Sequence, residues 1–325
     1  MSYRKSYLTR LFKSYLTPLF LAALLAGCAA RPPAGEGFVF GVMGDTPYND
    51  REEAHFVRML DRMSGEPLAF IVHVGDIKAG GNSPCTDELF EKRRGQLDRS
   101  RHAIVYTPGD NEWTDCRRKS NGAMDPIERL AKLREVFFAG RSALGAERIE
   151  TEAEDDRAAP CGAYPENRAW TRSRIRFVTL NIPGSQNNVG FDKASDDEAL
   201  CRNEANRRWL ERAVRESEGP QTRALVVAIQ ANPWNTKKPV YKDFLAQLEC
   251  AARRLRKPLL FVHGDTHTYR VDTPFTDASG PIANLTRLET YGSPFVGWVR
   301  VTVDPERPEV FTFEPKTEAI VAPTL

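Results

Sequence analysis

Carboxylate, amide and imidazole side chains follow apolar runs at five places in this 325-residue chain. The candidate groups are Asp45, Asp76, Asp110 with Asn111 and Glu112, Gln230 with Asn232, and Asp265 with His267. Four of the acids directly follow a glycine. Taken alone, each Gly-Asp pair is more simply a turn than a ligand, because both residues favour turns. Carboxylates gathered at one edge repel one another unless a cation lies between them, so the joint pattern predicts a cation site.

The apolar runs alternate with helical patterns. Strands are expected at 38–43, 68–74, 103–106, 175–180, 224–229 and 259–262, and helices at 50–63, 88–98, 126–138, 203–216 and 240–255. Runs at 285–290, 296–303 and 309–313 indicate antiparallel strands at the C-terminal end of the domain. Alternating strands and helices predict right-handed crossovers and covered sheet faces. The polar groups would then meet at the carboxyl edge of a sheet.

The composition favours one large domain. The chain is 41% hydrophobic, which suffices for a full core, and no break in composition divides it. Residues 38–325 are expected to form this domain. The acidic, patternless stretch 150–170 is expected to be a surface insertion.

The order and spacing of the polar groups resemble the five blocks of the calcineurin-like metallophosphoesterases, as a divergent branch. The matching stretches are Gly44-Asp45, Gly75-Asp76, 109–112, Asn232-Pro233 and 264–267. The resemblance implies an α/β fold, a four-layer αββα sandwich of mixed sheets with an antiparallel C-terminal part. It also implies a hydrolase in which metal-bound hydroxide attacks a phosphate mono- or diester, a small-molecule substrate.

Carried over by position, the resemblance implies two sets of metal ligands. One ion would be held by Asp45, Asp76 and His267, and the other by Asp76, Asp110, Asp265 and the amide of Asn232. The family's first block is Asp-x-His, and here Pro47 replaces that histidine. Carboxylate and amide oxygens suit magnesium or manganese better than zinc or iron. We therefore expect one or two divalent ions, with Mn or Mg favoured.

Asn111 and Glu112 are the catalytic candidates. Asn111 stands where the family places a histidine near the leaving group. An amide cannot supply the general-acid catalysis worth ~10²–10⁴ in rate, although it can donate to a phosphoryl oxygen. Glu112 would orient Asn111 or hold a water, or both residues would only close the turn.

Four further residues are candidates for substrate contacts, namely Tyr48, Lys78, Asn187 and Gln230. Tyr48 would donate a hydrogen bond at the mouth of the site, and Asn187 belongs to an amide-rich loop. The ammonium of Lys78 could replace one cation among the carboxylates. Lys78 could equally be a solvated loop lysine.

The first 27 residues have the character of a secretory signal. Four basic residues precede an apolar stretch at 18–26, far shorter than the ~20 residues of a membrane span. The sequence Leu25-Ala26-Gly27-Cys28 resembles the bacterial lipobox, in which Cys28 would be lipidated. The alternative is a plain cleaved signal with a chance cysteine. The lipobox, followed by a tether at 28–37, predicts an outer-membrane lipoprotein on the periplasmic side of the bacterial envelope, with a lipid anchor as its only membrane contact.

Export would change the net charge of the mature chain and would allow its cysteines to form disulfides. Taking the four basic residues of the leader from the 46 in the chain leaves 42 against 44 acidic residues, so no nucleic-acid partner is expected. Disulfides become possible in the periplasm. We expect Cys85–Cys116 to join the loops after Asp76 and Asp110, Cys161–Cys201 to form a second pair, and Cys250 to stay free in a helix.

Two other functions compete with the hydrolase. A phosphate- or cation-binding lipoprotein could keep the fold and the pocket without turnover. A structural envelope lipoprotein is less favoured, because anchoring does not need polar groups gathered so densely.

Overall fold

The strand expected at 38–43 lies at the centre of the first of two sheets. The computed structural model describes residues 35–155, 161–277 and 280–317. The first sheet has the order β14-β13-β1-β2-β3. Its strands are β1 (Phe38–Met43), β2 (Ile71–His73), β3 (Ile104–Tyr106), β13 (Gly297–Val303) and β14 (Phe311–Thr317). β1, β2 and β3 are parallel, whereas β13 runs antiparallel to both β1 and β14.

The second sheet has the order β4-β5-β6-β7-β8-β12-β9. Its strands are β4 (Glu152–Glu154), β5 (Tyr164–Arg172), β6 (Ile175–Thr179), β7 (Ala224–Ala228), β8 (Leu259–His263), β9 (Arg270–Asp272) and β12 (Leu285–Glu289). Strands β6, β7, β8 and β12 are parallel, and β4, β5 and β9 are antiparallel to their neighbours. A separate hairpin pairs β10 (Thr276–Asp277) with β11 (Gly280–Pro281).

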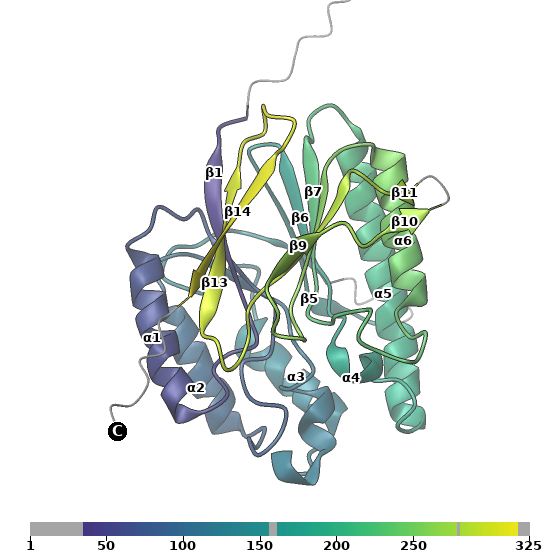
Figure 1. The fold of residues 1–325 in the computed structure, drawn as a ribbon. Helices are drawn as coiled ribbons and strands as arrows, with labels where there is room; N and C mark the ends of the chain where they lie inside the picture. Colours follow the sequence, from purple (N-terminus) through teal and green to yellow (C-terminus); the bar gives the residue numbers. More distant parts are fainter. Residues whose placement is uncertain (1–34, 156–160, 278–279, 318–325) are drawn as a thin grey trace, which may run out of the picture. The chain divides into compact units, whose positions relative to one another are not determined.

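Helices cover the outer face of each sheet (Figure 1). The long helices are α1 (Asp50–Ser64), α2 (Asp87–Asp98), α3 (Pro126–Phe137), α5 (Lys193–Glu218) and α6 (Lys242–Leu255). Helices α1, α2 and α3 lie beside the first sheet, and α5 and α6 beside the second. Single turns, namely η1 (Thr114–Arg117), η2 (Lys119–Asn121) and α4 (Gly184–Asn187), lie in the loops at the carboxyl edge.

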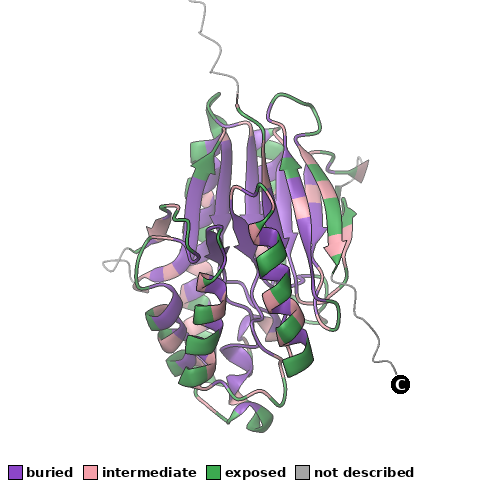
Figure 2. Ribbon diagram, turned by 90° about the vertical axis from the view of Figure 1, so that its left-hand side faces the viewer, coloured by how far each residue is buried: buried purple, intermediate pink, exposed green. Residues whose placement is uncertain are grey.

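The two sheets pack against each other through apolar side chains. Along β1, Phe40 and Val42 face the second sheet, while Met43 faces the helices, because successive strand residues point to opposite faces. Figure 2 shows the result, with buried strands in the middle and exposed residues on the outer faces of the helices, on the edge strands and in the loops. The expected αββα sandwich of mixed sheets is confirmed.

The antiparallel C-terminal part is formed by β13 and β14, as expected. The run at 285–290 differs, because its strand β12 lies parallel to β8 and extends the second sheet. Helix α5 also begins ten residues before the expected start at Asn203. Its first turn is polar, and Asp192 caps it by accepting a 2.8 Å hydrogen bond from the Ser195 N–H.

The stretch 150–170 is not the surface insertion that its composition indicates, since it contributes β4 and much of β5. Two of its polar residues are buried because they are paired. The Glu166 carboxylate accepts hydrogen bonds from Arg134, and the Asn167 amide donates to Asn206 at 2.7 Å. Hydrogen bonding between buried polar groups explains why an acidic sequence forms a core strand.

Both expected disulfides are present, Cys85–Cys116 and Cys161–Cys201, and Cys250 is free and exposed on α6. Within the described ranges, no helix has the length and hydropathy needed to cross a bilayer. Cys28 and the expected leader lie outside the described residues.

Candidate active site at the carboxyl edge

Three of the Gly-Asp acids have the same unusual backbone conformation. Asp45, Asp76 and Asp265 each follow a strand with positive φ, at 54°, 58° and 77°. This left-handed region is uncommon outside glycine, though Asp tolerates it better than most residues. The turns direct the carboxylates toward one another across the edge shared by the two sheets, and residues in such conformations cluster at functional sites.

Asp45 and Asp265 join the two sheets directly. The Asp265 N–H donates to Asp45 Oδ1 at 3.0 Å, and Asp265 Oδ2 accepts from the Asn232 N–H at 2.9 Å. Asp45 is fully buried. No donor among the described residues reaches its second oxygen, Oδ2. A side chain on Gly264 would place its Cβ only 2.0 Å from that oxygen.

Asp76 lies at the centre of the site and is surrounded by donors. Its Oδ2 accepts from Asn111 Nδ2 at 2.8 Å, the Tyr48 hydroxyl at 3.1 Å and Gln230 Nε2 at 3.2 Å. Its Oδ1 accepts from the Asn111 N–H at 3.1 Å. All of these donors are neutral.

Asp110 is paired with a second buried acid, Asp115, which the sequence did not reveal. The Ser185 hydroxyl lies 2.8 Å from Asp110 Oδ2 and 2.6 Å from Asp115 Oδ1. Asp115 is buried because η1 turns the chain back under the loop. Its position five residues after Asp110 gave the one available signal. In the described part of the chain, no group donates a hydrogen bond to Asp110 Oδ1.

Glu112 braces the loops rather than orienting Asn111. Its Oε1 accepts from the backbone N–H of Gly109 at 2.6 Å and of Asp76 at 3.0 Å, and from the Tyr106 hydroxyl at 2.7 Å. The carboxylate therefore fixes the loop after β3 to the loop after β2. Asn111 uses its amide differently, donating to Tyr48 at 2.9 Å as well as to Asp76.

Gln230 and Asn232 are both present, but only one side chain faces the acids. Gln230 Nε2 lies 3.4 Å from Asp265 Oδ1 in addition to its contact with Asp76, and its Oε1 accepts from the Gly184 N–H at 2.6 Å. The Asn232 amide instead donates to Thr266 at 2.8 Å and accepts from the Trp234 N–H. Its backbone N–H, not its side chain, contacts Asp265.

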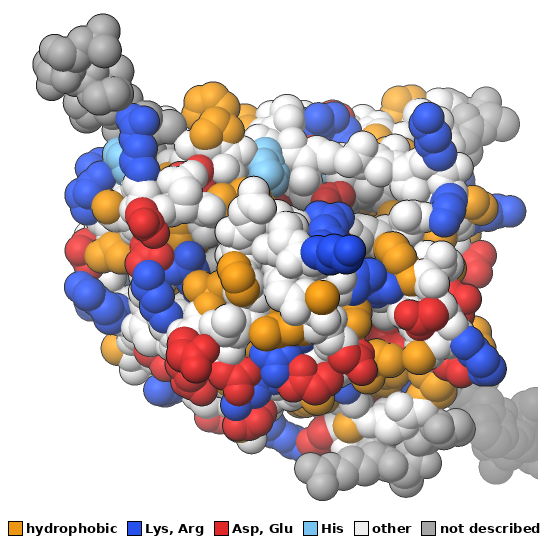
Figure 3. Space-filling model, turned by 90° about the horizontal axis from the view of Figure 1, so that it is seen from below, with side chains coloured by type: hydrophobic (Ala, Val, Ile, Leu, Met, Phe, Trp, Pro, Cys, Tyr) orange, Lys and Arg blue, Asp and Glu red, His pale blue; other side chains and the backbone are white. Residues whose placement is uncertain are grey.

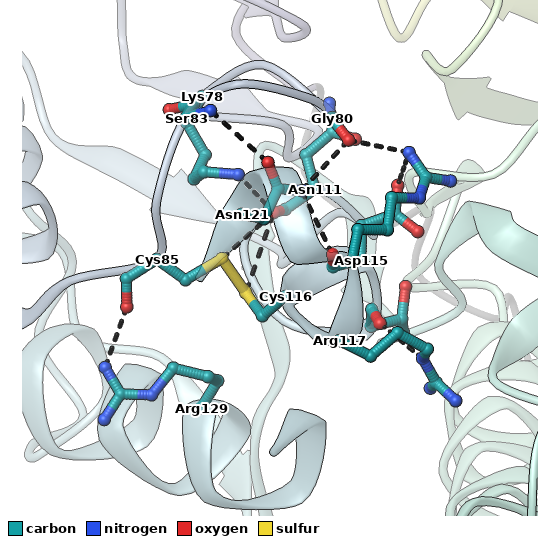
Figure 4. The surroundings of a disulfide bond; sticks show 12 residues. Lys78, Gly80, Ser83, Cys85, Asn111, Asp115, Cys116, Arg117, Asn121 and Arg129 are labelled. Atoms are coloured by element: carbon teal, nitrogen blue, oxygen red, sulfur yellow. Dashed lines mark hydrogen bonds and ion pairs between the residues drawn. A yellow bond between two sulfur atoms is a disulfide. The ribbon is translucent and has the colours of Figure 1, made fainter. Parts of the chain in front are cut away.

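Lys78 is buried, not a solvated loop lysine. Its ammonium donates to the carbonyls of Ala79 at 2.7 Å and Asn111 at 2.8 Å. Figure 4 shows this contact beside the Cys85–Cys116 disulfide, whose sulfurs lie 3.7 and 3.9 Å from the same Asn111 oxygen. Lysine and disulfide together hold the Asn111 backbone in place.

Asn187 points away from the acids. Its amide donates to Asn203, and its oxygen accepts from the buried Arg202. It lines a groove of about 410 Å³ between α5 and α6. The predicted substrate contact by Asn187 therefore lies on a different face from the carboxylates.

Burial and mutual repulsion strongly raise the pKa values of the acids. Burial, followed by the Asp265 charge, raises the pKa of Asp45 well above its usual range, and burial followed by Asp110 does the same for Asp76. Burial and Asp110 raise the pKa values of Asp265 and Asp115 to about 7. Burial lowers the pKa of Lys78 to about 8. Arg118 and Lys78 therefore compensate only part of the negative charge of the ionised acids.

The strand histidines His73 and His263 are buried core residues. Burial lowers the pKa values of His73 and His263 to about 3, so both are neutral. His267 alone of the three reaches the site, with its Nε2 3.8 Å from Asp45 Oδ1 and its Nδ1 2.7 Å from the Ser293 carbonyl. A carbonyl accepts, so Nδ1 carries the proton and Nε2 is free to accept.

These residues fit one hard cation better than two. Across the described ranges, no three His, Cys, Asp or Glu side chains are arranged to hold a metal ion. Asp110 Oδ1 and Asp265 Oδ1 nevertheless both face Gly184, where an added Cβ would lie 2.6 and 2.8 Å from them. Magnesium commonly binds through one or two carboxylates plus water and substrate oxygens. The Asp110–Asp265 pair has that character.

The site opens on the lower face of the molecule. Figure 3 shows this face, where acidic side chains gather in a row and the centre is mostly uncharged. Arg118 is half exposed, 2.7 Å from Asp115 Oδ2 and 3.3 Å from the Ser185 hydroxyl. A hollow of about 540 Å³ adjoins Tyr48, between the starts of α1 and α2.

Comparison with solved structures places the fold among those of the dimetal phosphatases. A dimetal phosphatase from Danio rerio is similar to this chain with a TM-score of 0.55 and 14% identity, covering 86% of this chain and 96% of its own. GAP50, the anchor in the inner membrane complex of Plasmodium, is similar with a TM-score of 0.47 and 11% identity, covering 86% and 89%. No family model and no curated protein matches the chain.

The likeness to the dimetal phosphatase extends over 86% of this chain. At 14% identity it concerns the fold alone. The chemistry has to be argued from the side chains.

Proposed function

We propose that this protein is an exported phosphoesterase that hydrolyses a phosphate mono- or diester with one divalent cation, magnesium or manganese. The observation that carries the proposal is that oxygens of Asp110 and Asp265, from the two sheets, meet at Gly184 on a fold similar to that of a dimetal phosphatase. Two buried acids with pKa values near 7 favour either a proton or a cation as partner.

Asp110 and Asp265 would hold the ion. When bound, it would lower the pKa of water and neutralise phosphoryl oxygens. Arg118, half exposed beside Asp115, is placed to attract the phosphate charge. The hollow beside Tyr48 has polar lining residues, including Asn82 and Ser83, and gives room for the organic part of the ester.

A second candidate is binding of a phosphate ester without turnover. Both amide hydrogens of Asn111 are already donated, to Tyr48 and Asp76, so neither is left for a leaving group. That observation favours a site that keeps its pocket and has lost general-acid catalysis.

Hydrolysis of p-nitrophenyl phosphate and bis(p-nitrophenyl) phosphate by the full-length protein in detergent tests the proposal. We expect turnover that requires Mn²⁺ or Mg²⁺ and falls at least about 100-fold in Asp265→Asn. Asp197→Asn, the same change at an exposed residue of α5, should leave the rate unaltered. If the protein binds the ion and the phosphate ester but does not hydrolyse the ester, the second candidate is favoured. If the protein neither binds nor hydrolyses the ester, both candidates are excluded.

We also propose that the protein is a lipoprotein of the bacterial outer membrane, facing the periplasm. The lipobox-like Leu25-Ala26-Gly27-Cys28 supports this location. Cys28→Ala should move the protein from the membrane fraction to the soluble periplasmic fraction. Retention of the variant in the membrane fraction would contradict lipid anchoring.

A further inference from the structure

The hydroxyl of Tyr48 lies at the meeting point of three groups. Asp76 Oδ2 is 3.1 Å away, Asn111 Nδ2 2.9 Å and His267 Nε2 3.2 Å. The Tyr48 and His267 rings meet edge to face at 5.3 Å. Two of these neighbours, Asp76 and His267, are residues that the sequence predicted as ligands of the first ion.

Asp76 has little capacity left for a metal ion. A carboxylate offers about four lone-pair directions in total. Four hydrogen bonds already reach it, three at Oδ2 and one, from the Asn111 N–H, at Oδ1. A carboxylate that bridges two ions would have to give up several of these bonds.

His267 is likewise turned toward the phenol. Its Nδ1 proton is donated to the Ser293 carbonyl, so Nε2 presents a lone pair. An imidazole nitrogen in that state is a good metal ligand. Here the group nearest to this lone pair is the Tyr48 hydroxyl, whose single proton is donated either to Asp76 Oδ2 or to His267 Nε2 and not to both at once.

The chain holds Tyr48 in place from its own side. The Tyr48 N–H donates to Glu52 Oε2 at 2.8 Å, and the other Glu52 oxygen accepts from Asn49 at 2.7 Å and Ser293 at 2.8 Å. Glu52 is buried at the start of α1. The phenol is therefore fixed by the same helix terminus that follows the Asp45 loop.

We infer that the Tyr48 hydroxyl replaces the first ion of a dinuclear pair. Tyr48 fills the Asp76 and His267 side of the first half-site, where Asp45 Oδ2 keeps no donor among the described residues, and only the Asp110–Asp265 half takes a cation. The cation at the Asp110–Asp265 half rests on the function proposed above, whereas the replacement of the first ion by Tyr48 does not.

Counting bound Mn²⁺ per chain tests this inference. The full-length protein and its variants would be stripped with chelator, loaded with Mn²⁺, dialysed and analysed by mass spectrometry for metal content. We expect Tyr48→Ala to bind one equivalent more than the natural chain, because removal of the phenol frees Asp76 and His267. The double variant Tyr48→Ala/Asp76→Asn should lose that additional equivalent. Tyr269→Ala, which removes a tyrosine stacked on Tyr291, is the control and should bind as the natural chain does.

A second arm does not depend on how well Tyr48→Ala folds. Asp76→Asn alone should leave the ion count of the natural chain unchanged, because Asp76 is not a ligand of the remaining ion. Loss of ion in Asp76→Asn, two equivalents in the natural chain, or no gain in folded Tyr48→Ala would each overturn the inference. If the natural chain binds no ion but Tyr48→Ala gains one, the replacement of the first ion by Tyr48 holds, whereas the cation at Asp110 and Asp265 and the proposed phosphoesterase fail.

Discussion

Asp265 and Asp115 each have a pKa of about 7, because burial and the Asp110 carboxylate both disfavour their ionised forms. The unfolded chain gives an Asp a pKa of about 3.9. Between these two values the folded chain binds more protons than the unfolded chain, so folding is favoured at lower pH and that stability is lost as the pH rises through 7.

Without metal, the protein should therefore become less stable between pH 5.5 and pH 8. The expected loss is about 2 kcal/mol for each of the two acids. Urea unfolding in EDTA at several pH values measures it, and Asp265→Asn should remove about 2 kcal/mol from a loss to which the raised pKa values of Asp45 and Asp76 also contribute. Saturating Mg²⁺ should diminish the slope, because a cation stabilises the ionised acids. Stability that is constant or rises with pH in EDTA would contradict these shifts.

The types of residue at the site could be predicted from the sequence, but their directions could not. The Gly-Asp pattern correctly located Asp45, Asp76, Asp110 and Asp265 at one edge. It could not show that the Asn232 amide turns away or that Asp115 turns inward. Side-chain direction depends on loop geometry and on hydrogen bonds between residues far apart in the chain.

At the scale of elements, the short α4 turn completes the site from the second sheet. It follows β6 and contributes the Gly184 backbone and the Ser185 hydroxyl to the Asp110 side. Any side chain at position 184 would enter the space between the Asp110 and Asp265 oxygens.

Gly184→Ala should weaken ion binding without unfolding the protein. Its Cβ would displace both carboxylates, and we expect Mn²⁺ affinity to fall at least about tenfold, by analogy with disruption of the groups that orient metal ligands. Isothermal titration calorimetry measures the affinity. Gly95→Ala, on an exposed face of α2 with no atom within 4 Å of the new Cβ, should leave binding intact and raise stability by roughly 0.5–1 kcal/mol. Equal affinities for the two variants would contradict the placement of the ion.

The Cys85–Cys116 disulfide joins the two loops that carry Asp76 and Asn111. The double variant Cys85→Ser/Cys116→Ser should lose about 3–4 kcal/mol of stability, as expected for closure of a loop of 31 residues. It should also weaken Mn²⁺ binding, because the sulfurs pack on the Asn111 carbonyl. The Cys161–Cys201 disulfide closes a loop of similar size, so Cys161→Ser/Cys201→Ser is the matched control. An equal loss of Mn²⁺ binding in both double variants would show that the loss follows from lower stability and not from the contact with the Asn111 carbonyl.

Most elements followed from the apolar pattern because buried parallel strands read as continuous apolar runs. The exceptions have a common cause. Strand β5 and the start of α5 are both polar: β5 is buried through partners such as Arg134 and Asn206 that lie distant in the sequence, whereas the start of α5 is capped by the adjacent Asp192 and lacks the apolar pattern that marks the rest of the helix. Local composition carries no trace of such pairing.

For the whole molecule, the two sheets are joined where the acids meet. Asp45 ends β1 of the first sheet and Asp265 follows β8 of the second, and the bond between them crosses the interface. Binding of an ion between Asp110 and Asp265 would likewise link the sheets. A ligand that binds only the folded state stabilises it.

Saturating Mg²⁺ should accordingly raise the thermal unfolding midpoint of the natural chain at pH 8. At 100 times its dissociation constant the ion would add about 2.7 kcal/mol. Differential scanning fluorimetry of the natural chain and of Asp110→Asn measures the difference. A shift of the same size in both proteins would mean that the ion binds elsewhere.

The central claim is that the carboxyl edge holds one divalent cation between Asp110 and Asp265. Direct titration of the chelator-stripped protein with Mn²⁺, followed by electron paramagnetic resonance of the free ion, tests it most directly. We predict one site per chain, shared with Mg²⁺ by competition and absent from Asp265→Asn. No saturable site, two sites, or one site that persists in Asp265→Asn would contradict the claim.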